Sequence, residues 1–262
     1  MKKKLYQDAA REIAEARSNA KSVGRISEKN GLFELEDAYA IQQINVQTAI
    51  RSGHRIIGRK IGLTSKAVQK QLGVDQPDFG ILFSDMQYQD GDEISIKQLI
   101  QPKVEGEIAF VLKKDILNKD LTLNELISSI DYVLPAIEIV DSVVENWNIT
   151  LFDTVADNAS SALYVLGNQP TLISGLDLAL EGMILEKNGQ QVAMGIGAAC
   201  LEHPLKSCLW LARKMIEYGE PLLAGEVILS GALGPMVTIE PGDHIRLRLT
   251  RLGEVNFYLN GL

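Results

Sequence analysis

The most informative stretch of this sequence is Val104-Glu105-Gly106-Glu107-Ile108-Ala109-Phe110-Val111-Leu112. Strand side chains alternate with a period of two, so Glu105 and Glu107 share a face with Ala109 and Val111. The opposite face is also apolar, which is typical of a strand that is covered on both sides. Gly106 lies between the glutamates, and a strand glycine favours the close approach of a ligand or another backbone.

A second carboxylate lies in an equally apolar setting, in Leu134-Pro135-Ala136-Ile137-Glu138-Ile139-Val140. Burying an unpaired carboxylate is costly, and neither stretch interleaves Lys or Arg at matching spacing. Glu105, Glu107 and Glu138 converging from two strands would suit Mg²⁺ or Mn²⁺, which prefer oxygen ligands. The alternative interpretation is that these glutamates lie at strand ends and face water, with Glu105 and Glu107 on a solvated edge.

Lys60 is a charged residue within the expected strand Ile56-Ile57-Gly58-Arg59-Lys60-Ile61-Gly62. A partly buried lysine near a metal can orient a substrate carboxylate or transfer a proton. Alternatively, Lys60 lies on an edge strand, where a charge discourages aggregation. Asp78 follows Pro77 in a predicted turn, where Asp often bonds its own backbone, and by itself it indicates no site.

The remaining pattern predicts helices first and strands afterwards. Apolar residues recur at helical spacing from Leu5 to Ala20, and a second helix is expected from Leu35 to Ile50. Further helices are expected over Ser65–Leu72, after the capping box at Thr122, and from Pro204 to Tyr218. Further strands are expected over Glu93–Ile96, Tyr132–Asp141, Ser160–Leu166, Val227–Ser230, Val237–Ile239, His244–Leu249 and Val255–Leu259, with a hairpin turn at Asn188-Gly189.

This order of elements predicts an α+β protein and lacks the βαβ alternation of a doubly wound fold. We expect a helical N-terminal arm over residues 1–55 and a β-rich catalytic domain over residues 56–262, which together may be counted as one domain. The helix from Leu5 to Ala20 has a weak apolar stripe made mostly of alanine. Such a stripe suits a shallow contact with another subunit, so we expect a homo-oligomer.

Composition excludes several classes of protein. The chain has 262 residues, of which 46% are hydrophobic and 23% charged, a balance that argues against disorder. Its 26 Lys and Arg against 34 Asp and Glu give a net charge of −8, which argues against a nucleic-acid partner or an anionic membrane surface. Cys200 and Cys208 are too few for a disulfide framework. No long apolar run occurs, so we expect a cytoplasmic protein.

Several segments along the chain carry a family resemblance: Gly58-Arg59-Lys60-Ile61-Gly62-Leu63-Thr64, Gly73-Val74-Asp75-Gln76-Pro77-Asp78-Phe79-Gly80, Glu105-x-Glu107, Asp153-Thr154-Val155-Ala156-Asp157-Asn158-Ala159-Ser160 and Gly231-Ala232-Leu233-Gly234-Pro235-Met236. In this order they resemble the 2-keto-4-pentenoate hydratases of the fumarylacetoacetate hydrolase superfamily, over nearly the whole chain. The resemblance implies a mixed β-sandwich or roll of the fumarylacetoacetate hydrolase type. It also implies a divalent metal, Mg²⁺ or Mn²⁺, held by Glu105, Glu107 and Glu138.

The resemblance further implies roles for individual residues. The family's active-site lysine falls on Lys60 and its acidic partner on Asp78, whereas Ser160, Gly231 and Leu233 would border the substrate. The implied reaction adds water to 2-hydroxypenta-2,4-dienoate, a small anion, to give 4-hydroxy-2-oxopentanoate in the catabolism of aromatic compounds. The implied partners are further copies of the chain and a related decarboxylase.

Two other functions remain open from the sequence. The chain could be a 4-oxalocrotonate decarboxylase, which removes CO₂ from 2-oxo-3-hexenedioate with the same metal and enolate chemistry but needs a pocket for a second carboxylate. It could also be a non-catalytic assembly partner of a related enzyme. Such a partner would not require Lys60 and all three glutamates, and their presence argues against this interpretation.

Overall fold

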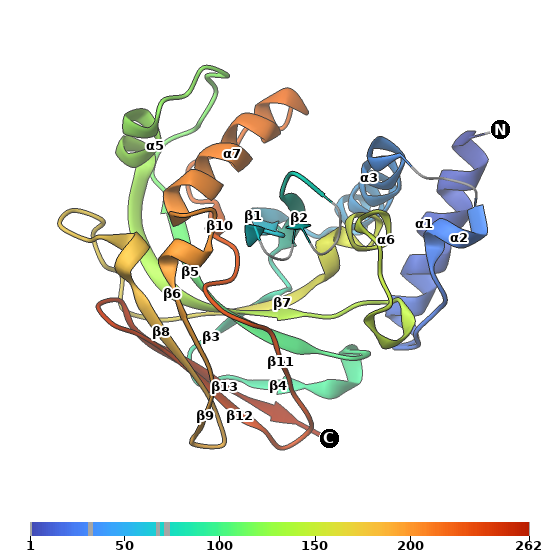
Figure 1. The fold of residues 1–262 in the computed structure, drawn as a ribbon. Helices are drawn as coiled ribbons and strands as arrows, with labels where there is room; N and C mark the ends of the chain where they lie inside the picture. Colours follow the sequence, from blue (N-terminus) through green and yellow to red (C-terminus); the bar gives the residue numbers. More distant parts are fainter. Residues whose placement is uncertain (1, 31–33, 67–68, 71–73, 262) are drawn as a thin grey trace.

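Two β-sheets with helices around them make up the residues that the computed structural model describes, which are 2–30, 34–66, 69–70 and 74–261 (Figure 1). The helices are α1 (Lys2–Ser18), α2 (Ile26–Asn30), α3 (Leu35–Arg51), α5 (Leu123–Ser129), α6 (Leu151–Ala156) and α7 (Pro204–Glu217). The strands are β1 (Ile56–Gly62), β2 (Asp78–Phe83), β3 (Gln87–Gln89), β4 (Glu93–Ser95), β5 (Lys103–Leu112), β6 (Ile130–Val140), β7 (Ser161–Leu166), β8 (Gly182–Lys187), β9 (Gln190–Ile196), β10 (Val227–Leu229), β11 (Val237–Thr238), β12 (His244–Leu249) and β13 (Gly253–Asn260).

The larger sheet carries the charged residues singled out in the sequence. Its strand order is β2-β1-β10-β5-β6-β7-β3, with β11 also paired to β5. Strand β1 lies between β2 and β10, and β5 lies between β10 and β6, so neither is an edge strand. The alternatives of an edge-strand Lys60 and of Glu105 and Glu107 on a solvated edge are therefore wrong.

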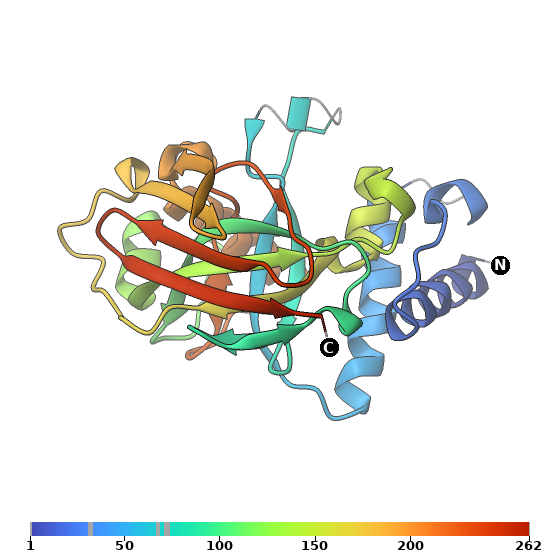
Figure 2. The ribbon, with the colours of Figure 1, turned by 90° about the horizontal axis from the view of Figure 1, so that it is seen from below.

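The smaller sheet covers one face of the larger one. Its order is β4-β13-β12-β8-β9, and Figure 2 shows β12 and β13 lying across the strands of the larger sheet. A Cβ on Gly106 would lie 2.6 Å from Leu247 Cδ1 and 2.7 Å from Met183 Sδ, both in the smaller sheet. The sequence predicted that a ligand or another backbone approaches Gly106, and the structure instead places side chains of the smaller sheet against it, so this glycine allows the two sheets to pack closely.

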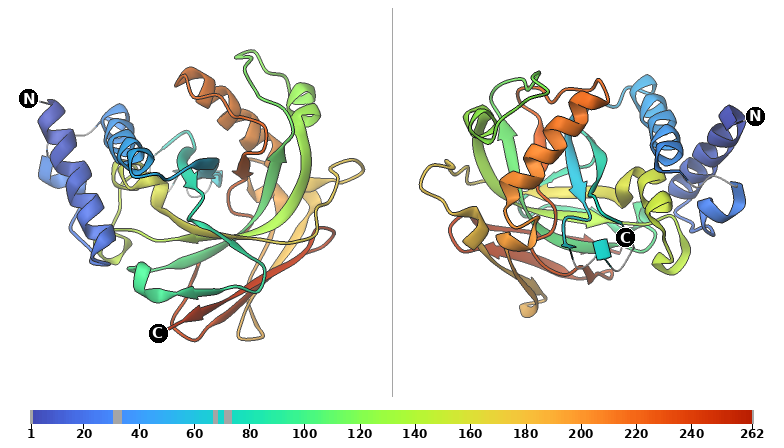
Figure 3. Two further views of the ribbon diagram at one scale, coloured as in Figure 1. Left: turned by 180° about the vertical axis from the view of Figure 1, so that it is seen from behind. Right: turned by 45° about the horizontal axis from the view of Figure 1, so that its top comes forward.

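The N-terminal helices pack against the body of the chain rather than projecting from it. The small residues of α1, including Ala9, Ala10 and Ala16, are buried at 1–4% exposure, and α1 contacts α3 (Figure 3). In turn the side chain of Gln42 in α3 donates hydrogen bonds to the carbonyls of Phe79 and Val155. The alanine stripe is thus covered within the chain, and it no longer supports a contact with another subunit.

Most predicted elements occur within a few residues of their expected bounds, including the helical arm and the mixed sheets. Asp78 is an exception, because it begins strand β2 and is buried, whereas the sequence predicted a turn. The helix predicted over Ser65–Leu72 lies partly outside the described residues. Helices α2 and α6 and strands β2 and β3 were not predicted. Among the described residues, no helix combines the length and hydrophobicity needed to cross a membrane.

Candidate active site

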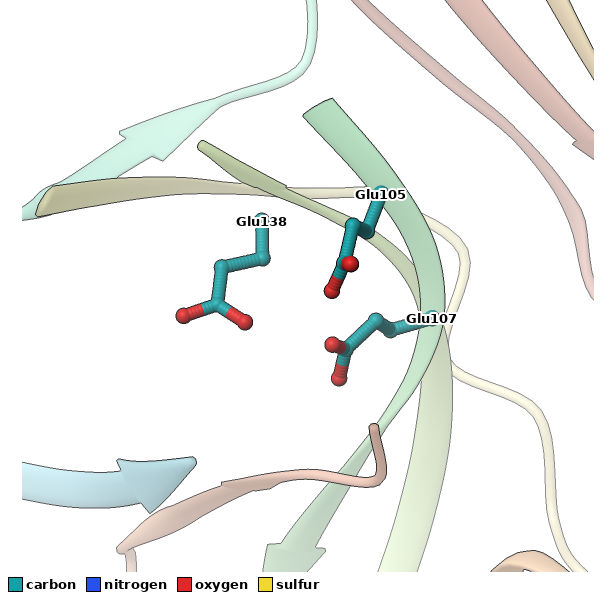
Figure 4. Close-up of side chains that lie close together, drawn as sticks. All are labelled: Glu105, Glu107 and Glu138. Carbon is teal, nitrogen blue, oxygen red and sulfur yellow. The ribbon is translucent and has the colours of Figure 1, made fainter. Parts of the chain in front are cut away.

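Three carboxyl groups converge on one face of the larger sheet. Glu105 and Glu107 lie two residues apart on β5, so they share a face, and Glu138 on β6 is directly opposite Glu105 in the register. One oxygen from each carboxyl group lies within 4.8 Å of the others, and Figure 4 shows all three groups directed into one space. Glu107 and Glu138 are fully buried, and Glu105 lines a cavity. This is the clustering that the apolar strand context predicted.

These carboxyl groups have few partners within the protein. Glu107 Oε2 accepts a hydrogen bond of 2.7 Å from the amide of Gly231. Glu107 Oε1 and both oxygens of Glu138 are buried without a hydrogen-bond donor. A buried carboxylate oxygen without a donor is costly unless a cation neutralises it. The donor set is made only of oxygen atoms, and it therefore fits a hard divalent cation such as Mg²⁺ or Mn²⁺.

Burial and mutual repulsion shift the titration of the cluster. Burial raises the pKa of Glu105 to about 7, and the neighbouring Glu138 adds to this rise. Burial, together with Glu138 and Glu105, also raises the pKa of Glu107 well above its usual value. Without a metal, burial and the neighbouring carboxyl groups therefore favour the protonated forms of Glu105 and Glu107.

Lys60 supplies the positive charge at this site. Its Nζ lies 3.3 Å from Glu138 Oε2, and its side chain is only 4% exposed. Burial by itself would lower the pKa of Lys60, but the surrounding carboxyl groups, led by Glu138, raise it above its ordinary value. Lys60 is thus a buried ammonium, which can donate hydrogen bonds but is a poor base.

Asp78 lies beside Lys60 because β1 and β2 pair in an antiparallel register that places Gly62 opposite Asp78. A Cβ on Gly62 would lie 2.1 Å from Asp78 Oδ1 and 3.3 Å from Lys60 Nζ, so the glycine leaves room for both groups. Burial raises the pKa of Asp78 to about 6, although the charge of Lys60 opposes this rise. The structure thus brings Lys60 and Asp78, which the family resemblance pairs, to the same part of the site, where the charge of the ammonium acts on the Asp78 carboxyl group.

A cavity of about 400 Å³ opens next to these groups. Its polar residues gather around the charged cluster and are Lys60, Thr64, Ser65, Asp78, Glu105, Thr154 and Ser160. Its apolar residues include Val140, Trp147, Ile149, Pro235 and Met236. Lys60 is the only cation among the described residues that line the cavity. The cavity therefore has a charged part and an uncharged part.

The structure places the other predicted site residues at different depths. Ser160 lines the cavity, and its Oγ lies 3.1 Å from the hydroxyl of Thr154, which also lines it. Gly231 touches the cluster through the amide that binds Glu107. Leu233 is fully buried, and its amide donates to the carbonyl of Gly106. Leu233 is not among the residues that line the cavity, whereas its neighbours Ala232, Gly234, Pro235 and Met236 are, so the border with the substrate stays a prediction for this loop.

Two functional features were missed from the sequence. Thr154 belongs to helix α6, which begins with a capping box between Thr150 and Asp153, and that Thr-x-x-Asp pattern could have identified the helix. The second feature is a turn over Asn158–Ser160 in which three consecutive residues have φ values of 54°, 53° and 53°. Left-handed backbone costs about 1–2 kcal/mol for each residue other than glycine, and no local sequence pattern predicts it.

Comparison with known protein families identifies the class of protein to which this fold and carboxylate cluster belong. Residues 52–259 match the family model "Fumarylacetoacetate (FAA) hydrolase C-terminal", so the chain belongs to the fumarylacetoacetate hydrolase family. It is 50% identical to the 2-keto-4-pentenoate hydratase of Paraburkholderia xenovorans (strain LB400) over 249 residues, covering 95% of this chain and 93% of that protein. It is 42% identical to the 2-hydroxyhexa-2,4-dienoate hydratase of Comamonas testosteroni over 253 residues, covering 96% of each.

A solved structure is similar over the whole fold. The 4-oxalocrotonate decarboxylase from Pseudomonas putida G7, complexed with magnesium and adipate, matches with a TM-score of 0.94 and 35% identity, covering 99% of this chain and 98% of that one. The resemblance inferred from the sequence is therefore confirmed, as is the predicted combination of a helical arm with mixed sheets.

Proposed function

We propose that this chain is a hydro-lyase that adds water to 2-hydroxypenta-2,4-dienoate, giving 4-hydroxy-2-oxopentanoate in the catabolism of aromatic compounds. The observation that carries this proposal is the cavity, which joins a carboxylate cluster and one ammonium group to an uncharged part. Relatives that are 50% and 42% identical over almost the full length are named as hydratases of such dienoates.

Glu105, Glu107 and Glu138 would hold a divalent metal, and we propose Mg²⁺ or Mn²⁺. Support comes from the all-oxygen donor set, the buried oxygens that lack donors, and the magnesium in the similar decarboxylase structure. When bound, the cation supplies Lewis-acid stabilisation of negative charge on the substrate's carboxylate and 2-oxygen. The Gly231 amide keeps the Glu107 carboxylate fixed in the absence of other partners.

The reaction needs protons to move at defined carbon atoms. The enol loses its proton, C5 gains one to form an α,β-unsaturated ketone, and water then adds its oxygen at C4 while C3 gains a proton. We propose that Lys60, a permanently charged donor, orients the anionic substrate, and that Asp78 positions water and accepts its proton. A pKa of about 6 leaves Asp78 mostly ionised at neutral pH, so it can accept a proton.

The second candidate function is decarboxylation of 2-oxo-3-hexenedioate, because the structural match at a TM-score of 0.94 is a 4-oxalocrotonate decarboxylase. That substrate carries a second carboxylate, which would have to lie in the uncharged part of the cavity. Val140, Trp147, Ile149 and Met236 line the cavity and are uncharged, and Lys60 is the one cation among the described lining residues. A desolvated carboxylate needs a cationic partner, so the lining favours the monoanionic dienoate, and a second carboxylate would have to recruit Lys103, whose Nζ lies 4.6 Å from the centroid of the Trp147 ring.

The experiment that tests the proposal is turnover of each substrate by the purified protein. The protein is freed of metal with EDTA, reloaded with Mg²⁺ or Mn²⁺, and assayed by absorbance for dienoate loss and by CO₂ release from the dicarboxylate. We expect metal-dependent hydration, lost in Glu138→Gln and retained in the surface variant Glu240→Gln. CO₂ release without hydration would establish the decarboxylase, and inactivity on both substrates with metal bound would support the non-catalytic assembly partner.

Further parts of the proposal concern assembly and location. We propose a homo-oligomer, supported now by exposed Val192, Met194 and Ile196 on β9, an end strand of the smaller sheet. A complex with a related decarboxylase would use the same kind of surface. Light scattering of the isolated protein tests the homo-oligomer, which a mass of one chain at micromolar concentration would contradict, and light scattering of a mixture with the decarboxylase tests the complex, which unchanged separate masses would contradict. The proposed cytoplasmic location is supported by the free thiols of Cys200 and Cys208.

A further inference from the structure

The N-terminal arm reaches the wall of the active site through a buried ionic contact. Arg17, at the end of α1, places its guanidinium between Asp141 and Asp157, which are 124 and 140 residues away in sequence. Its Nη1 lies 3.0 Å from Asp141 Oδ2, and its Nε and Nη2 lie 3.1 and 2.8 Å from the two oxygens of Asp157. Nη2 also donates to the Asp141 carbonyl. The aspartate side chains are 0% and 3% exposed.

The two aspartates connect this contact to both sides of the cavity. Asp141 directly follows β6, the strand that carries Glu138, and its carboxylate accepts the amides of Ile100 and Gln101 at 2.9 and 2.7 Å. Asp157 directly follows α6, and its carboxylate accepts the amide of Val143 at 2.9 Å. In the described part of the chain, Arg17 is the cation that pairs with either carboxylate.

The same two aspartates hold the left-handed turn Asn158–Ser160. The amide of Ser160 donates to the carbonyl of Asp157 at 2.9 Å, and the carbonyl of Ser160 accepts the amide of Asp141 at 2.8 Å. Ala159 and Ser160 of this turn line the cavity. A run of left-handed residues other than glycine persists only where its surroundings hold it in place. The two backbone hydrogen bonds of Ser160 are thus made with Asp157 and Asp141, the two residues whose side chains Arg17 binds.

We propose that Arg17 is a positioning residue: by neutralising and bridging Asp141 and Asp157, it fixes the turn that presents Ser160 to the substrate. Without the guanidinium, two buried carboxylates face each other with only backbone amides as partners, and the ion pairs that hold Asp141 and Asp157 on either side of the turn are lost. The inference rests on the proposed function, because it assigns Ser160 to the substrate side of that site.

A double-mutant cycle tests this coupling. We expect Arg17→Ala to lower kcat/KM for the dienoate about 10²-fold, since a displacement of about 1 Å has an effect of that size. If Arg17 acts through Ser160, the double variant with Ser160→Ala will be no worse than the more severe single variant. Arg17→Lys keeps the charge but not the planar fork, and it should recover part of the loss. Arg11→Ala, on the same helix, is the control and should match wild type.

Two results would overturn the proposal: losses from Arg17→Ala and Ser160→Ala that multiply in the double variant, or a lower melting temperature for Arg17→Ala with unchanged kcat and KM. Each would show that Arg17 only attaches the arm. If Arg17→Ala does not fold, the cycle is run with Arg17→Lys and is judged in the same way.

Hydrogen exchange gives a readout that does not depend on turnover. We expect Arg17→Ala to speed exchange of the Ser160 and Asp141 amides, while those of β5 stay protected and Mg²⁺ affinity measured by calorimetry stays within about twofold, since the ligands are untouched. Unchanged exchange at both amides would contradict the proposal. If wild type hydrates no dienoate, the proposed function fails, and this exchange result alone decides whether Arg17 holds the turn.

Discussion

Replacing Glu105 with glutamine is expected to stabilise the metal-free protein while it removes the response to metal. Three carboxyl groups lie within 4.8 Å of one another around this residue. Two unit charges at that separation repel by about 3.5 kcal/mol at an effective dielectric constant of about 20. The rise in the pKa of Glu105 from 4.5 to about 7 corresponds independently to about 3 kcal/mol. The first figure is the repulsion of one carboxylate pair, and the second is the net cost of ionising Glu105, in which burial is the largest contribution and repulsion by Glu138 the next.

The sign of this effect depends on pH. Between about pH 4.5 and 7, the folded protein keeps the proton of Glu105 that the unfolded chain has already released. Metal-free stability therefore falls as the pH rises through this window and stays low above it. Glutamine cannot ionise, so Glu105→Gln should match wild type at pH 4 and exceed its free energy of unfolding by about 3 kcal/mol at pH 8.

The assay is urea unfolding at pH 4 and pH 8, with EDTA and with excess Mg²⁺, followed by the fluorescence of Trp147 and Trp210. Mg²⁺ at about 100 times its Kd should stabilise wild type by about 2.7 kcal/mol and leave the variant nearly unchanged. Glu240→Gln, at an exposed position, controls for the loss of one charge. The reasoning is refuted if Glu105→Gln gains no stability at pH 8 in EDTA, or if Mg²⁺ stabilises it as much as wild type.

Other predictions concern the remaining residues of the site. Glu107→Ala and Glu138→Ala should each abolish metal-dependent turnover with an unchanged circular dichroism spectrum, and near-normal turnover at limiting Mg²⁺ would remove that residue from the ligand set. Lys60→Ala should lower kcat by about 10²–10⁴-fold without weakening metal binding, and Lys60→Arg should rescue it poorly; normal steady-state kinetics would show that Lys60 has no catalytic role. Gly62→Ala places a Cβ 2.1 Å from Asp78 Oδ1, so turnover should fall together with about 1–3 kcal/mol of stability in thermal unfolding. A fully active and stable Gly62→Ala would contradict the packing of Asp78 against this glycine.

The carboxylate cluster was predictable because its signal is local. Alternation along β5 places Glu105 and Glu107 on one face, and Glu138 is conspicuous as the one charge in an apolar run. Charged residues are unusual in a strand that is covered on both faces. A glutamate in such a strand can therefore be recognised from the sequence without knowing which strands pair. The register that sets Glu105 opposite Glu138 became visible only in the folded sheet.

Features that depend on distant pairing were not predictable. Asp78 follows a proline in a turn-like context, and the strand that it begins, β2, was not predicted because it forms by pairing with β1. The sequence predicts a close approach at Gly106 but does not identify what approaches, because its packing partners, in β8 and β12, lie far along the chain. Arg17 belongs to an exposed-looking stretch of α1, and its partners are more than a hundred residues away. In each case the contact depends on the tertiary structure, and secondary-structure propensities do not encode which distant residues meet.

The position of β10 in the larger sheet has a consequence for synthesis of the chain on the ribosome. Strands β5 and β6 are neighbours in sequence and can pair once residue 140 has emerged, whereas β1 joins them only through β10, Val227–Leu229. The topology therefore allows the carboxylates on β5 and β6 to come together before the strand carrying Lys60 has its place in the sheet. At about 5–20 residues per second this interval lasts several seconds. During this interval the nascent chain can carry Glu105, Glu107 and Glu138 close together without Lys60. Pairing of β10 with β5 and β1 then brings Lys60 to the three glutamates.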